Sequence, residues 1–112
     1  MISVTIYETD HQYCGFLCKG HAGYAEEGYD IICSAVSALT VNTIQSLEQF
    51  TEDGMEVEQA QDGGYLKLNL TGTLSKEADV LMKSLVLGLQ TIEANYGSEF
   101  VNVQIQKCRE TI

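Results

Sequence analysis

The chain has 112 residues, a common length for one domain, and two independent domains are not expected. Apolar residues make up 45% of the sequence and charged residues 20%, close to the averages of globular proteins, which excludes wholesale disorder. Six basic residues against sixteen acidic ones give a formal net charge of −10. Because such a field repels phosphate groups, we expect no direct binding to nucleic acid or to an anionic membrane. It would attract a basic peptide, although acidic charge also serves solubility alone.

The first ten residues, MISVTIYETD, have neither the basic nor the apolar region of a secretory signal. No apolar run in the sequence approaches the ~18 residues that cross a bilayer. We therefore expect a soluble, cytoplasmic protein whose four cysteines are reduced thiols.

Seven elements are predicted in chain order: a strand over residues 2–7, a β-like run over 13–19, a helix over 31–50, strands over 55–61 and 66–70, a helix over 75–96 and a strand over 101–106. Strands are predicted from alternating apolar and polar residues, and helices from apolar residues at spacings of three and four. Asp62-Gly63-Gly64 predicts a hairpin turn between the third and fourth strands.

Each predicted helix has one apolar stripe. In the first helix the stripe consists of Ile32, Val36, Leu39, Leu47 and Phe50. In the second it consists of Ala78, Leu81, Met82, Leu85, Leu89, Ile92 and Tyr96. Ser75 is placed to cap the start of the second helix and Gly97 to end it. Val80 and Leu87 lie on the opposite side of that helix, a heptad apart.

This pattern predicts an α+β fold, a two-layer α/β sandwich in the order β-β-α-β-β-α-β. Strands with one apolar and one polar face require a sheet that is covered on one side. Both helices are therefore expected on the same face of a mostly antiparallel sheet, with residues 1–112 in one domain.

The connection between the second strand and the first helix carries the candidate chemistry. It reads Gly20-His21-Ala22-Gly23-Tyr24-Ala25-Glu26-Glu27-Gly28-Tyr29-Asp30-Ile31-Ile32-Cys33, which is long for so small a domain. His21 follows the strand, and Cys33 is predicted in the first turn of the helix, where the partial positive charge favours a thiolate. A neighbouring imidazole could accept the thiol proton, as in cysteine hydrolases. The plainer interpretation is that Cys33 packs as a small apolar side chain.

Cys14, Cys18 and His21 have a spacing that superficially looks like half of a zinc site. In a strand, however, Cys14 and Cys18 would lie about 13 Å apart, too far for one metal ion or one disulfide. We therefore expect no metal and no cofactor, and we expect Cys14, Cys18 and Cys108 to pack as strand residues.

Asp30 has two competing interpretations. Its predicted position just before the helix suits an N-cap, and it could instead orient His21 as the third member of a triad. Glu26 and Glu27 suit solvated loop charges, or contacts with basic residues of a peptide.

At Gly20-His21-Ala22 and at Gly28-Tyr29-Asp30-Ile31-Ile32-Cys33-Ser34-Ala35-Val36-Ser37, the chain resembles the ribosomal-processing cysteine protease family. The family pattern is Gly-His-Ala followed by Gly-x-Asp-Ile-Val-Cys-Ala-Ala-Val-Ser. This chain departs from it at Ile32 and Ser34, and both changes leave the reacting groups intact. The likeness in length and element order extends over essentially the whole chain.

The resemblance implies a cytoplasmic, homodimeric endopeptidase that removes an N-terminal extension from the precursor of the twenty-seventh large-subunit ribosomal protein, cutting after an aromatic residue. It implies that His21 is the general base, that Cys33 is the nucleophile, and that a mobile loop between them meets the peptide. The substrate-loop residues are Gly23, Tyr24, Glu26, Glu27, Gly28 and Tyr29. An alternative function is a non-catalytic ribosome-assembly module that binds a basic ribosomal peptide through the same loop.

Overall fold

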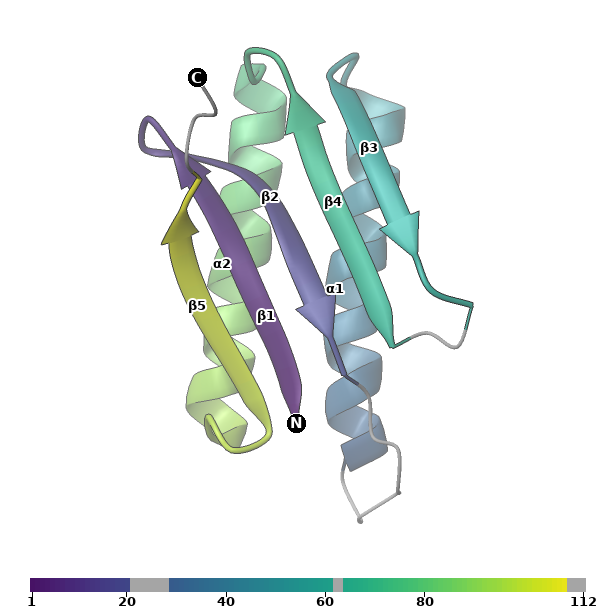
Figure 1. The fold of residues 1–112 in the computed structure, drawn as a ribbon, viewed down its shortest axis with the longest axis vertical. Coiled ribbons are helices and arrows are strands. Elements are labelled where there is room, and N and C mark those ends of the chain that lie inside the picture. The colour runs from purple at the N-terminus through teal and green to yellow at the C-terminus, as the bar shows by residue number, and fades with distance from the viewer. Residues whose placement is uncertain (21–28, 62–63, 109–112) are drawn as a thin grey trace.

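The computed structural model describes residues 1–20, 29–61 and 64–108, and it contains the predicted elements in the predicted order (Figure 1). They are β1 (Ile2–Thr9), β2 (Gln12–Lys19), α1 (Tyr29–Phe50), β3 (Gly54–Gln59), β4 (Tyr65–Thr71), α2 (Lys76–Tyr96) and β5 (Val101–Lys107). Within these described ranges, neither helix combines the length and the apolar character needed to cross a membrane.

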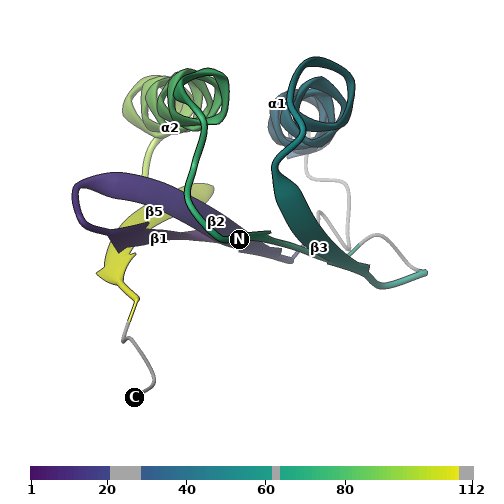
Figure 2. The same cartoon turned by 90° about the horizontal axis from the view of Figure 1, so that it is seen from above.

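The strands form one five-stranded sheet in the order β3-β4-β2-β1-β5. β1 is antiparallel to β2, β2 to β4 and β3 to β4, whereas β1 and β5 run parallel. Both helices cover the same face of this sheet (Figure 2). The predicted two-layer α+β sandwich with a mostly antiparallel sheet is therefore confirmed.

A two-residue turn joins β1 to β2. Thr9 pairs with Gln12, and the two residues between them, Asp10 and His11, have φ angles of 50° and 66°. Positive φ at both central residues is the geometry of the tight hairpin turns that match the twist of the flanking strands. The break in alternation that the sequence shows at these residues is therefore a turn.

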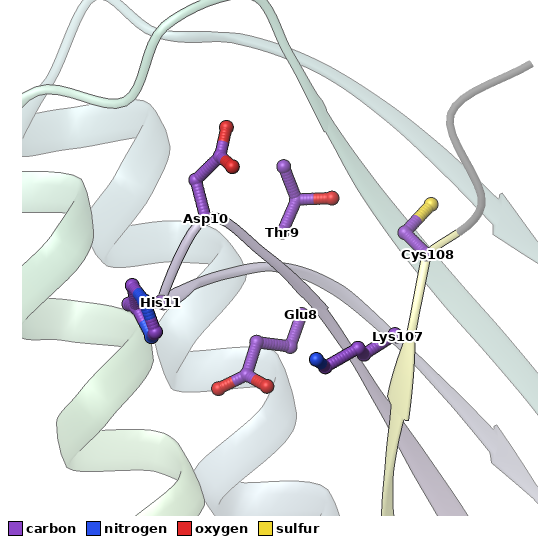
Figure 3. Close-up of a pocket in the computed structure, with 6 residues that line it drawn as sticks. All are labelled: Glu8, Thr9, Asp10, His11, Lys107 and Cys108. Atoms are coloured by element: carbon purple, nitrogen blue, oxygen red, sulfur yellow. The ribbon is translucent and has the colours of Figure 1, made fainter.

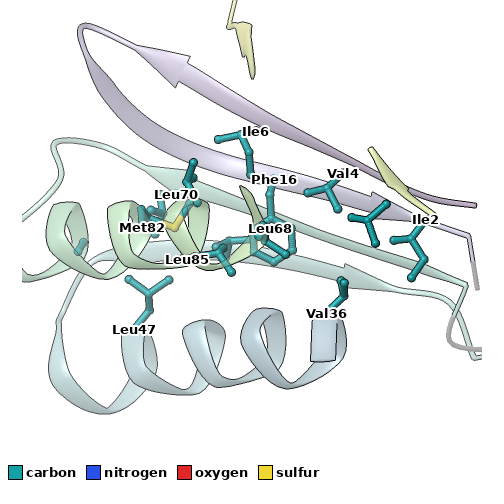
Figure 4. Packing of buried hydrophobic residues seen from close by; sticks show 14 of the residues in the cluster. Ile2, Val4, Ile6, Phe16, Val36, Leu47, Leu68, Leu70, Met82 and Leu85 are labelled. Carbon is teal, nitrogen blue, oxygen red and sulfur yellow. The ribbon is translucent and has the colours of Figure 1, made fainter. Parts of the chain in front are cut away.

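The hydrophobic core lies between the sheet and the helices (Figure 4). Ile2, Val4 and Ile6 of β1 are almost completely buried because alternate residues of a strand point to the same face. The strand register places Phe16 beside Ile6, and Leu68 beside Phe16. One apolar row therefore crosses the central strands under the helices.

α1 differs from its predicted stripe at two kinds of position. Phe50, the last residue of the helix, is 71% exposed, so the prediction that it packs in the core is wrong. Periodicity gives the angle of a residue around the helix axis but not the length over which another layer covers it. Conversely, Thr40 and Thr43 are buried, and their hydroxyls donate to the carbonyls of Val36 and Leu39 at 3.0 and 2.8 Å. These bonds satisfy the buried hydroxyl groups.

α2 begins and ends as predicted. The Ser75 hydroxyl accepts a hydrogen bond from the Ala78 N–H at 3.0 Å, which satisfies one of the free donors of the first turn. Gly97 ends the helix with a φ of 103°. Val80 and Leu87 are 63% and 66% exposed, which confirms that they lie on the face opposite the core.

Candidate active site

Gly20 fixes the point at which the chain leaves the sheet. β2 ends at Lys19, and the Gly20 N–H donates to the carbonyl of Gly64 at 3.0 Å. Gly20 has a φ of +92°, and a Cβ at this position would collide with the carbonyl oxygen of Met1. The position therefore requires glycine. Gly20, which precedes His21 in the chain, is thus held against Met1 and against Gly64, just before β4.

Cys33 lies on α1 between two buried residues. Ile32 is 4% exposed and Val36 is 2% exposed, whereas Cys33 is half-buried, as its place at the border of the apolar stripe predicts. α1 begins at Tyr29, so Cys33 is the fifth residue of the helix. It therefore lies at the start of the second turn, whereas the sequence predicted a place in the first turn.

Cys33 lines a pocket of about 170 Å³ between α1 and the sheet. The lining residues are Ile2, Cys18, Gly20, Cys33, Val36, Ser37, Thr40, Val41, Gln59, Tyr65 and Leu66. Ile2 and Val36 are buried and form apolar walls, while Ser37 and Gln59 are exposed and mark the opening. A pocket of this size can hold a single amino-acid side chain next to the Cys33 thiol.

Cys18 supplies a second thiol to this pocket. It lies on β2, is half-buried and packs against the core, which confirms the prediction that it is a packed strand residue. Burial raises the pKa of Cys18 to about 11, and negative charge on the nearby Cys33 adds to the rise. Cys18 is therefore a neutral thiol at neutral pH.

The other two cysteines lie close together at a different place. The Cys14 thiol donates to the Tyr7 carbonyl at 3.5 Å, and burial, with a smaller effect from Cys108, raises the pKa of Cys14. Cys108 follows β5 and is exposed, so the prediction that it packs as a strand residue is wrong. β5 is exposed over its last four residues, which shows that this end of the strand extends past the core. Within the described ranges, no cluster of three or more His, Cys, Asp or Glu side chains could hold a metal ion.

The predicted base and most of the predicted substrate loop lie outside the described residues. These are His21, Gly23, Tyr24, Glu26, Glu27 and Gly28. The pairing of His21 with Cys33, and the contact of the loop with a peptide, therefore remain predictions.

Asp30 occupies a different backbone position from the one predicted. α1 begins at Tyr29, so Asp30 is the second residue of the helix and not the residue before it. The predicted N-cap role does not match these bounds. The apolar stripe from which the helix start was inferred marks the packed face of a helix, and the first helical residue can precede that face by one or two positions. A role for Asp30 in orienting His21 remains a prediction.

Several lining residues, among them Thr40, Val41, Gln59 and Tyr65, were not singled out from the sequence as site residues. The register of the β3–β4 hairpin pairs Gln59 with Leu66, which brings the end of β3 and the start of β4 to the same place. In the sequence, the turn residues 62–64 are the signal that β3 and β4 form a hairpin. It predicts the hairpin but not which side of the sheet α1 would cover.

A second pocket, of about 280 Å³, lies at the other end of the sheet (Figures 1 and 3). Its lining residues are Glu8, Thr9, Asp10, His11, Lys107 and Cys108. The β1–β2 turn and the end of β5 form this pocket. α1, whose fifth residue is Cys33, begins at the opposite end of the sheet (Figure 1). The second pocket therefore takes no part in the chemistry of Cys33.

The sequence and the structure are similar to those of known proteases. A sequence model of the family described as cysteine protease Prp matches residues 1–101. The ribosomal processing cysteine protease Prp of Staphylococcus aureus strain Mu50 is 28% identical over 97 residues, covering 86% of this chain and 92% of that protein. The protein of the same name from Bacillus subtilis strain 168 is 29% identical over 101 residues, covering 86% and 90%.

The fold comparison agrees. The crystal structure of an essential ribosomal processing protease Prp from Staphylococcus aureus, in complex with a covalently linked product peptide, matches this structure with a TM-score of 0.85. The two are 26% identical, and the match covers 95% of this chain and 100% of that chain. The family model and the shared fold thus place this chain among the cysteine proteases. Within that class, it belongs to the cysteine protease Prp family.

Proposed function

We propose that this chain is an endopeptidase in which Cys33 is the nucleophile and His21 is the general base. The observation that carries the proposal is that the half-buried Cys33 forms part of the wall of a pocket large enough for one side chain of a peptide. Gly20 lines the same pocket, and His21 is bonded to Gly20 in the chain. His21 therefore directly follows a residue that lies at the pocket.

The reaction follows from these two groups. The His21 imidazole accepts the Cys33 proton, and the thiolate attacks the carbonyl carbon of the scissile peptide bond. The C–N bond then breaks as the imidazolium gives its proton to the leaving amine, which leaves a thioester on Cys33. His21 next takes a proton from water, whose oxygen attacks the thioester and releases the acid. Backbone N–H groups near Cys33 would stabilise the oxyanion in both steps.

We propose that the substrate is the precursor of the twenty-seventh large-subunit ribosomal protein. The relatives from Staphylococcus aureus and Bacillus subtilis are named as ribosomal processing proteases, and one was solved with a covalently linked product peptide. The net charge of −10 suits a basic ribosomal precursor. The apolar walls at Ile2 and Val36, with Tyr65 also lining the pocket, suit an aromatic side chain just before the cut.

We also propose that the chain acts as a cytoplasmic homodimer. Val80 and Leu87 form an exposed apolar line on α2, and Val80 also lines an open hollow of about 370 Å³ with Phe50 and Leu81. Phe50, on the neighbouring helix α1, therefore extends the apolar surface across both helices. A second copy of this chain would bury side chains that are otherwise in contact with water.

The test of the activity is incubation with the ribosomal precursor, followed by intact-mass measurement. We expect two fragments separated at a bond that follows an aromatic residue. Cys33→Ala should give none, while Cys108→Ala should cleave normally because Cys108 is exposed and lies away from the pocket. Binding without cleavage at any time would instead support a non-catalytic ribosome-assembly module. Cleavage by Cys33→Ala would refute the assignment of the nucleophile.

A further inference from the structure

Cys18 on β2 and Cys33 on α1 reach the same pocket from the two layers of the fold. Cys18 pairs with Val4 in the strand register, and Val4 is buried under the helices, so the Cys18 side chain points to the same face. Cys33 lies between the buried residues Ile32 and Val36 on α1. Both cysteines line the pocket of about 170 Å³.

The two thiols are close enough for charge to act between them, because negative charge on Cys33 contributes to the raised pKa of Cys18. The remaining cysteines, Cys14 and Cys108, are not among the residues that line the pocket. Cys18 is therefore the thiol that a modified Cys33 would meet first.

We propose that Cys18 and Cys33 form a reversible oxidation site, in which a hydroperoxide oxidises Cys33 and Cys18 then closes a disulfide with it. The first step rests on the proposed function, because it requires Cys33 to be the reactive thiolate of the chain. The second step depends only on the placement of the two thiols in one pocket.

The two steps balance with hydrogen peroxide as the oxidant. The Cys33 thiolate attacks one peroxide oxygen, the O–O bond breaks, and Cys33 becomes a sulfenic acid as hydroxide takes up a proton to form water. The Cys18 sulfur then attacks the Cys33 sulfur and loses its proton, while the sulfenic oxygen leaves as water. Peroxide is reduced by two electrons, and the two thiols become a disulfide that a dithiol reductant can open again.

The electrostatics of the pocket separate the roles of the two thiols. Burial and the charge of Cys33 together hold the pKa of Cys18 well above its usual range, so Cys18 stays protonated at neutral pH. Since the thiolate is the form that attacks peroxide, Cys18 should not be oxidised first. Once Cys33 is a neutral sulfenic acid, that opposing charge is gone and Cys18 can ionise more readily.

The consequence is protection of Cys33 against irreversible damage. A sulfenic acid with no thiol beside it can be oxidised again to the sulfinic acid, which dithiols do not reduce. A disulfide to Cys18 removes the sulfenic acid before that second oxidation. The oxidised chain would be inactive but recoverable, because its nucleophile is held in a disulfide.

The sequence allows this disulfide to be mapped directly. Trypsin cuts after Lys19, so Cys14 and Cys18 fall in the peptide 1–19, while Cys33 falls in 20–67 and Cys108 in a separate fragment. The protein is treated with hydrogen peroxide, its remaining thiols are blocked, and it is digested without reductant. In Cys14→Ser, a linked 1–19/20–67 product identifies the Cys18–Cys33 bond alone.

We expect the linked peptide in the wild-type chain and in Cys14→Ser, with an intact mass lower by two hydrogen atoms. In Cys18→Ser and Cys18→Ala it should be absent, and peptide 20–67 should gain oxygen atoms instead. After dithiothreitol, Cys33 should become fully available to alkylation in Cys14→Ser but largely remain blocked in Cys18→Ser. Peptide 20–67 that gains two oxygens at the same rate with and without Cys18 would overturn the proposal.

The outcome is distinguishable from a failure of the proposed function. Linked peptide from a chain that does not cleave the ribosomal precursor would support the oxidation site and contradict the protease. Cleavage of the precursor by a chain that never forms the linked peptide would support the protease and contradict the oxidation site.

Discussion

The carboxylate of Asp53 accepts a hydrogen bond from the backbone N–H of Ser75 at 2.8 Å, twenty-two residues further along the chain. Ser75 is also the N-cap of α2, through its bond from the Ala78 N–H. Asp53 therefore ties the segment before β3 to the start of the second helix. This contact links the α1 side of the fold to the α2 side.

We expect this contact to make stability depend on acidic pH. Hydrogen bonds from the Ser75 hydroxyl and backbone N–H lower the pKa of Asp53 in the folded chain. Since the folded pKa lies below the unfolded value of about 3.9, the stabilisation is present above that value and is lost as the pH falls through the folded pKa. Urea unfolding can measure how much stability is lost between about pH 5 and about pH 3, where carboxyl groups titrate. In Asp53→Asn this loss should be smaller than in the wild type, because the titrating carboxylate is gone. Glu52→Gln, at an exposed neighbour, is the control and should leave the profile unchanged.

Cys33 should be the thiol that reacts fastest with iodoacetamide near neutral pH. The thiolate is the reacting form, and we propose that His21 withdraws the Cys33 proton. Tryptic mapping after brief treatment should find the label on peptide 20–67 before peptide 1–19 or the fragment that holds Cys108. Cys108 is the stringent comparison because it is the exposed one of the four. Faster labelling of Cys14, Cys18 or Cys108 would contradict the assignment of the nucleophile.

His21→Ala should abolish cleavage and leave the melting temperature within about 5 °C, since an imidazole next to the end of a strand contributes little core volume. The matched control is His11→Asn in the exposed β1–β2 turn, where asparagine tolerates the φ of 66°. That variant should melt and cleave like the wild type. An active His21→Ala enzyme would show that another group is the base.

Gly20→Ala should impair both stability and cleavage. Its Cβ would collide with the Met1 carbonyl oxygen, and alanine is strained at a φ of +92°, so the end of β2 must move. Gly72→Ala is the control because Gly72 also has a positive φ, of +78°, but a Cβ there would meet no atom within 4 Å. Thermal melting and cleavage rates should separate the two: Gly72→Ala should lose about 1 kcal/mol of stability with normal cleavage. Equal activity losses in both variants would mean that the contact with Met1 is unimportant.

The dimer can be tested with Val80→Glu combined with Leu87→Glu. Two buried charges without partners would oppose association, so light scattering should report a shift from the dimer mass toward 12.3 kDa. The paired substitution Gln104→Glu with Gln106→Glu, at exposed positions of β5, adds the same two negative charges away from this face of α2 and is the control. A wild-type mass of 12.3 kDa at micromolar concentration would exclude a stable dimer. A folded double variant that stays dimeric would move the interface to another surface.

Local pattern predicted most of the fold because each strand and helix has its own periodicity. Ser75 and Gly97 bracket α2 through short-range rules of capping, which need no knowledge of the rest of the chain. Phe50 and Cys108 were misplaced because exposure at the end of an element depends on how far the neighbouring layer extends. That distance is a property of the assembled fold and not of any local segment.

The candidate site was predicted only in part for the same reason. Cys33 was found through its helix and its motif. Gln59 and Tyr65, however, reach the pocket through a hairpin register and through the side of the sheet that α1 covers. Cys18 was predicted as a packed strand residue, and only the layer arrangement shows that it packs beside Cys33. A wall built from five separate elements has no sequence signature of its own.

The parallel pairing of β1 with β5 sets an order of events during biosynthesis. Ile2, which forms part of the pocket wall, pairs with Val101, and its N–H donates to the Phe100 carbonyl at 2.9 Å. While a ribosome is still making the chain, β1 has no partner on that edge until residue 101 has left the exit tunnel. The pocket wall at Ile2 is therefore held in place by β5 only after residue 101 has been made and has paired with β1.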